Sequence, residues 1–193
     1  MRARIRAVTA WGAANLLAMG VLSGCSMQQI GGVAATDSSS AFSAFSRPQR
    51  PDDVVPAALW TPLDTSPSRS DLHNDRKIAA GEDLAVYLVH AQPDVLCLVV
   101  QDLPGQASGG QDCDDGPTVV AHSMTLGWAT TSDPGHDRTA VLVPDGYTAT
   151  VTRGTFVLAG QGVVVAQGDG VEVALTNNAG RTLRLFGPTR SQR

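Results

Sequence analysis

Short runs of apolar, often β-branched residues alternate with turn residues from about residue 84 onward. The runs 84–90 and 95–101 are separated by the turn-like residues 91–94, and this arrangement predicts a β-hairpin. The second run is apolar at successive positions, so we expect both of its faces to be buried. The apolar stretches at 118–124 and 139–143 predict two further strands.

The last third of the chain shows the clearest strand pattern. In residues 171–176 every second residue is apolar and bulky, which is the period of a strand with one buried face. Turns are expected at Gly168–Gly170 and Asn177–Gly180, where glycine and asparagine allow positive φ angles. These features predict a meander of three strands, 161–167, 171–176 and 182–186, and the short segment 147–152 is also β-favouring.

No long segment with a helical apolar period occurs beyond the N-terminal region. About 120 residues of short strands are enough for a single hydrophobic core and too few for two. The sequence therefore predicts that residues 71–193 form one all-β, mainly antiparallel domain, a small sandwich or barrel.

Residues 25–70 have a different composition. A polar run occupies residues 36–40, and prolines recur after it. A chain of this kind buries too little apolar surface to offset its conformational entropy. The segment is therefore predicted to be a disordered linker or stalk, with a short helix possible only near residues 52–59.

The first residues carry the features of an export signal. Arg2, Arg4 and Arg6 precede an apolar stretch, residues 7–24. This stretch is too short and too often interrupted to be a membrane-spanning helix. The stretch ends in Leu22-Ser23-Gly24-Cys25, which resembles the lipobox of bacterial lipoproteins. This resemblance implies a signal peptide at residues 1–24 and acylation of Cys25. It also implies a cell-membrane location on the extracytoplasmic face, with the lipid as the anchor.

If Cys25 carries a lipid, two cysteines remain, Cys97 and Cys113. An exported protein enters an oxidising compartment, where an even pair usually forms a disulfide. A metal site would need more ligands, and reactive pairs usually show a Cys-x-x-Cys spacing. The prediction is therefore a structural disulfide between Cys97 and Cys113.

A second resemblance concerns residues 84–186. A strand containing Cys97, a Gly/Ser-rich loop to Cys113, and Val143-Pro144-Asp145-Gly146 before a β meander are similar to features of uncharacterised secreted β-rich proteins of actinobacteria. The resemblance implies one disulfide-closed β domain and brings no known activity.

Charge and motif spacing exclude several classes of function. Residues 25–193 contain 11 basic and 18 acidic residues, a net charge of −7, which argues against nucleic-acid binding. The acidic run 112–116 does not fit the calcium-loop pattern, and the histidines lack the spacing of a zinc site. His90, at a predicted strand end, is interpreted as structural. The sequence thus predicts no metal, no cofactor and no catalytic residues.

The leading functional hypothesis is a non-catalytic, extracytoplasmic binding or envelope-associated module, with an envelope protein or glycan as candidate partner. One alternative is an inhibitor of a secreted hydrolase that presents the loop 102–116. The other is an unrecognised hydrolase with a triad such as His122, Ser123 and Asp145. A pocket with converging His, Ser and Asp side chains would favour the enzyme, and a protruding loop would favour the inhibitor.

Overall fold

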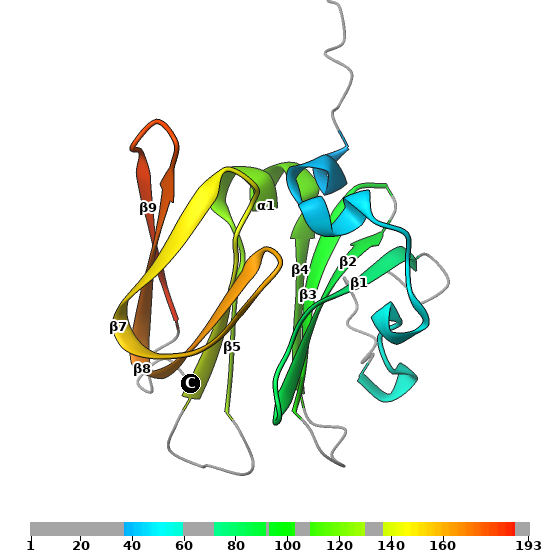
Figure 1. Cartoon of the computed structure of the whole chain (residues 1–193), viewed down its shortest axis with the longest axis horizontal. Helices are drawn as coiled ribbons and strands as arrows, with labels where there is room; N and C mark the ends of the chain where they lie inside the picture. The colour runs from blue at the N-terminus through cyan, green and yellow to red at the C-terminus, as the bar shows by residue number, and fades with distance from the viewer. Residues whose placement is uncertain (1–36, 60–71, 92, 103–108, 130–136, 188–193) are drawn as a thin grey trace, which may run out of the picture. The chain divides into compact units, whose positions relative to one another are not determined.

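The computed structural model describes residues 37–59, 72–91, 93–102, 109–129 and 137–187. Within these ranges the chain forms two antiparallel β-sheets, one short α-helix and four 3-10 helices (Figure 1). The prediction of a mainly antiparallel all-β fold is therefore confirmed. None of the helices in the described ranges has the length and apolar character that a membrane crossing requires. The predicted signal peptide, residues 1–24, and the predicted acylation site Cys25 lie outside the described residues.

The N-terminal sheet contains four strands in sequence order: β1 (Leu72–Ala80), β2 (Leu84–Ala91), β3 (Val95–Asp102) and β4 (Gly109–Asp115). Strands β2 and β3 form the predicted hairpin, paired without interruption along their length. The predicted loop 102–116 is largely strand where it is described, since β4 pairs with β3.

The C-terminal sheet has the order β5-β6-β8-β7, and β9 also pairs with β8. The predicted strand at 139–143 is confirmed as part of β6. Strands β8 and β9 pair across the expected turn at residues 177–180, and β7 also pairs with β8. The bounds are β5 (Thr125–Ala129), β6 (Asp137–Leu142), β7 (Tyr147–Gly160), β8 (Val163–Asn177) and β9 (Thr182–Phe186).

Alternate side chains of β2 and β3 point to opposite faces of the N-terminal sheet. One set packs against the C-terminal sheet and forms the central core of a sandwich, as expected for two facing sheets. The other set forms a second apolar cluster on the outer face. The central set on β2 and β3 is Leu84, Val86, Leu88, Leu96, Leu98 and Val100, all fully buried.

The predicted turn at Gly168–Gly170 is wrong, because β8 continues through it as one bent strand. The first half of β8 pairs with β6 and the second half pairs with β9. Gly168 and Gly170 have φ angles of 139° and 60°, which side-chain-bearing residues rarely adopt. Strand β7 bends beside them at Gly154, where φ is 100°. The glycines that suggested a chain reversal therefore permit a bend in two paired strands.

The predicted strand at 118–124 is also wrong, because residues Gly116–His122 form helix α1. The side chain of Asp115 accepts a hydrogen bond from the backbone N–H of Thr118 and caps the helix, and Pro117 lies in its first turn. Ser123, with φ of 64°, ends it. The local capping signals outweigh the β-branched residues that suggested a strand.

Residues 37–59, predicted as part of the linker, pack on the sandwich and belong with it to one compact unit. We call them the covering segment. Phe42 and Ala44 are buried in the central core, whereas Val55 and Leu59 cover the outer face of the N-terminal sheet. The segment contains η1 (Ser38–Ala41), η2 (Ser43–Ser46), η3 (Pro51–Asp53) and η4 (Ala57–Leu59) (Figure 1).

A buried carboxylate fastens the covering segment to β1. Asp53 accepts two hydrogen bonds of 2.6 Å from the guanidinium of Arg47 and others from the backbone N–H groups of Arg50 and Lys77. The contact with Arg47, reinforced by these backbone donors, holds the pKa of Asp53 far below its usual range. Arg76, also buried, donates to the carbonyls of Ala44 and Arg47. The segment is thus held by polar contacts as well as by apolar burial.

Candidate functional site

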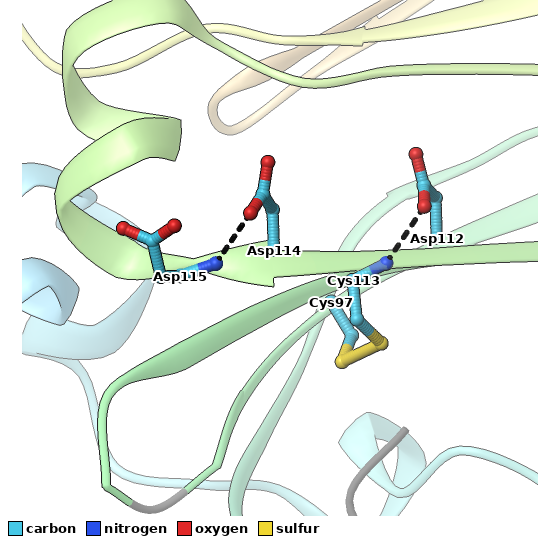
Figure 2. The surroundings of a disulfide bond; sticks show 5 residues. All are labelled: Cys97, Asp112, Cys113, Asp114 and Asp115. Atoms are coloured by element: carbon cyan, nitrogen blue, oxygen red, sulfur yellow. Dashed lines mark hydrogen bonds between the residues drawn. A yellow bond between two sulfur atoms is a disulfide. The ribbon is translucent and has the colours of Figure 1, made fainter. Parts of the chain in front are cut away.

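Cys97 and Cys113 form the predicted disulfide (Figure 2). The two residues lie directly opposite each other on β3 and β4, with 4.1 Å between their Cα atoms. Cys97 is fully buried in the apolar cluster on the outer face of the N-terminal sheet. The bond therefore ties the edge strand β4 to the middle of its sheet.

The acidic cluster beside the disulfide is occupied by local hydrogen bonds. Asp112 and Asp114 project from the face of β4 opposite the disulfide (Figure 2). Their carboxylates accept from the backbone N–H groups of Cys113 and Asp115, and Asp115 caps α1 through Thr118. Desolvation, with the nearby charge of Asp114, raises the pKa of Asp112. The three carboxylates therefore accept backbone hydrogen bonds at the end of β4 and at the start of α1.

The residues of the hypothetical hydrolase triad do not form a relay. The hydroxyl of Ser123 donates to the backbone carbonyl of Leu142, which is not the contact that a general base makes with a nucleophile. His122 is exposed at the end of α1, and Asp145 is exposed in the turn before β7. The geometry therefore gives no support to this triad.

A pocket of about 490 Å³ opens at the end of α1, beside the starts of β7 and β9. Arg181 and His122 are exposed there, and Tyr147 is half-buried. A guanidinium, an imidazole and an aromatic ring suit a ligand that combines an anionic group with a flat apolar face. The full lining is Ala121, His122, Tyr147, Arg181, Thr182 and Leu183.

A second polar site joins the covering segment to the β2–β3 hairpin. The Nε2 atom of His90 lies 3.0 Å from Oδ1 of Asp94 and 3.3 Å from Oδ1 of Asp37. The hydroxyl of Ser38 donates to the other oxygen of Asp94 over 2.8 Å. The ring of Phe45 meets the imidazole edge-on, with 6.0 Å between centroids. We call Asp37, His90 and Asp94 the histidine–carboxylate cluster.

Three different elements supply this cluster. Asp37 is the N-cap of η1, His90 lies near the end of β2, and Asp94 lies in the turn before β3. Hydrogen bonds from Ser39 lower the pKa of Asp37, with a smaller contribution from His90. The sequence suggested only a structural role for His90, and its contacts with Asp37 and Asp94 were not predicted. The only local signal was the separation of His90 and Asp94 across a hairpin turn.

Comparisons with protein-family models, with characterised proteins and with solved structures returned no match for this chain.

Proposed function

We propose that the protein is a bacterial lipoprotein anchored through Cys25, and that its β domain is a non-catalytic binding module on the extracytoplasmic face of the cell membrane. The observation that carries the proposal is the disulfide between Cys97 and Cys113. Structural disulfides persist in oxidising compartments outside the cytoplasm. Because the chain contains three cysteines, this pairing leaves Cys25, at the end of the lipobox-like sequence, as the single cysteine outside the bond.

Metabolic labelling tests the anchor. Cells that express the full chain are fed an alkyne analogue of palmitate, and the protein is then examined for label and for membrane association. We expect label in the wild type, and loss of both label and membrane association in Cys25→Ala. Equal labelling of the two proteins, or no label in the wild type, would contradict the anchor.

The pocket beside α1 supports a binding role for the displayed domain. Arg181 offers a planar fork of donors that matches a carboxylate, and Tyr147 offers a ring face against which a sugar can pack. Although residues 25–193 carry a net negative charge, this pocket presents a cationic side chain and an imidazole. A carboxylate-bearing envelope glycan is therefore the partner that the lining fits best.

Co-sedimentation of the detergent-solubilised full chain with insoluble envelope glycan tests this role. Arg181→Ala keeps the backbone N–H that donates to Asn177, so the turn is preserved while the guanidinium is lost. We expect at least a roughly tenfold weaker interaction, as for loss of a charge-assisted hydrogen bond. Arg153→Ala removes an exposed arginine of β7 outside the pocket lining and should bind like the wild type. Equal binding of both variants would reject the pocket as the binding surface.

A further inference from the structure

We propose that Asp37, His90 and Asp94 bind a divalent transition-metal ion of the zinc type. Among the described residues, this is the one group of three His, Cys, Asp or Glu side chains whose ligand atoms all lie within 4.8 Å of one another. The proposal does not depend on the lipid anchor or on the pocket beside α1.

The distances match those between the ligands of one ion. Zn–N and Zn–O bonds are about 2.0–2.2 Å long, which places neighbouring ligand atoms of a tetrahedral ion about 3.3 Å apart. Nε2 of His90 lies 3.3 Å from Oδ1 of Asp37 and 3.0 Å from Oδ1 of Asp94. A small adjustment of the side chains would therefore place one ion between the three donors.

The kinds of donor atom also favour such an ion. One imidazole nitrogen and two carboxylate oxygens suit zinc and its neighbours, whereas calcium prefers an all-oxygen set. The two carboxylates converge on one nitrogen, which can donate at most one proton. The side chain of Asp37 is 62% exposed and that of His90 is 15% exposed. The outer side therefore leaves room for a water as the fourth ligand.

Neighbouring groups already orient two of the ligands. Ser38 holds Oδ2 of Asp94, so Oδ1 faces His90, and the ring of Phe45 packs against the imidazole. Such supporting contacts are typical of metal sites. Gly116 packs closely behind them, since a Cβ atom there would lie 2.6 Å from Oδ1 of Asp94.

Calorimetric titration of the purified full chain, with its disulfide intact, against zinc chloride tests the proposal. We expect one Zn²⁺ per chain. Asp37→Asn is the key variant, because the amide keeps an oxygen acceptor for the N–H of Ser39 and removes only the charge. It should bind zinc at least roughly tenfold more weakly. Asp114→Asn, an exposed acid outside the cluster, is the matched control and should bind zinc like the wild type.

Substitution by Co²⁺ gives a spectroscopic test. The wild type should show the visible absorption of four-coordinate cobalt, zinc should abolish it, and His90→Ala should lack it. Absence of zinc binding, or equal binding by the wild type, Asp37→Asn and His90→Ala, would overturn the proposal, since a cluster held only by hydrogen bonds gives those results. If His90→Ala fails to fold, Asp37→Asn decides the question alone.

Discussion

The two sheets differ in which part of the chain buries their outer apolar face. Each sheet has one apolar face in the central core and apolar residues on its outer face as well. The N-terminal sheet covers its outer face with a separate stretch of chain, the covering segment. The C-terminal sheet covers its own outer face, because β7 and β8 bend. The first half of β7 and the second half of β8, together with β9, pack over residues such as Val141 and Val164.

This difference determines what holds each outer layer in place. The covering segment is joined to its sheet by buried polar contacts, above all the pair of Asp53 and Arg47. The folded-over half of the C-terminal sheet is continuous with the strands that it covers, so its position depends on backbone conformation at Gly154, Gly168 and Gly170. Loss of a charge should therefore destabilise the packing of the covering segment. A side chain added at a glycine should destabilise the bend in the C-terminal sheet.

Removal of the buried carboxylate should have the largest effect. We expect Asp53→Ala to lower the free energy of unfolding by about 3–5 kcal/mol, because it leaves Arg47 and two backbone N–H groups without their acceptor. Urea denaturation followed by circular dichroism measures the loss. Asp52→Ala is the control, since Asp52 is exposed and meets Lys77 at 3.4 Å, and should cost less than about 1 kcal/mol. Equal losses of stability in the two variants would mean that the buried contacts of Asp53 do not hold the covering segment in place.

Loss of the disulfide should have the next largest effect. The double variant Cys97→Ala/Cys113→Ala opens a loop with a sequence separation of 16 residues, and we expect it to lose about 3 kcal/mol of stability in the chain-entropy model. Denaturation with and without reductant measures this. Reductant should destabilise the wild type and leave the double variant unchanged. An insensitive wild type would mean that the bond adds nothing to the N-terminal sheet.

A side chain at the bend tests the C-terminal sheet. Gly168→Ala introduces a Cβ at φ of 139°, and we expect a loss of about 1–3 kcal/mol in the free energy of unfolding. Gly81→Ala is the control, because its nearest atom would be 3.8 Å away and its φ is not positive; it should be neutral or stabilise by up to about 1 kcal/mol. If Gly168→Ala is as stable as Gly81→Ala, the bend does not depend on glycine.

Acid should weaken the N-terminal sheet through Asp53, with the smallest effect of the four. Its pKa is lower in the folded protein than the unfolded value of about 3.9. Its contribution is therefore complete above about pH 5 and is lost as the pH falls through the unfolded value toward the folded one. The stability difference between wild type and Asp53→Ala should shrink by roughly 1 kcal/mol between pH 7 and pH 3. A stability difference between wild type and Asp53→Ala that does not change over this pH range would contradict the assignment.

Pairings between strands that follow each other along the chain were the most predictable. The β2–β3 hairpin and the turn between β8 and β9 follow from alternation and nearby turn residues, and the disulfide follows from cysteine pairing. Helix α1 was missed because its two valines outweighed the capping aspartate in the reading of residues 118–124. The histidine–carboxylate cluster was not predictable, because Asp37 reaches His90 and Asp94 only after the covering segment has packed against the sheet.

The sequence by itself determined the all-β class, the central hairpin and the cysteine pair, because these depend on local periodicity or on short motifs. The tertiary structure alone decided that residues 37–59 cover a sheet rather than form a linker, and that Gly168–Gly170 bends a strand rather than reverses the chain. Both outcomes depend on the burial of an apolar sheet face formed by residues distant in the sequence. That requirement arises only when the sheets have formed, so no local pattern of residues records it.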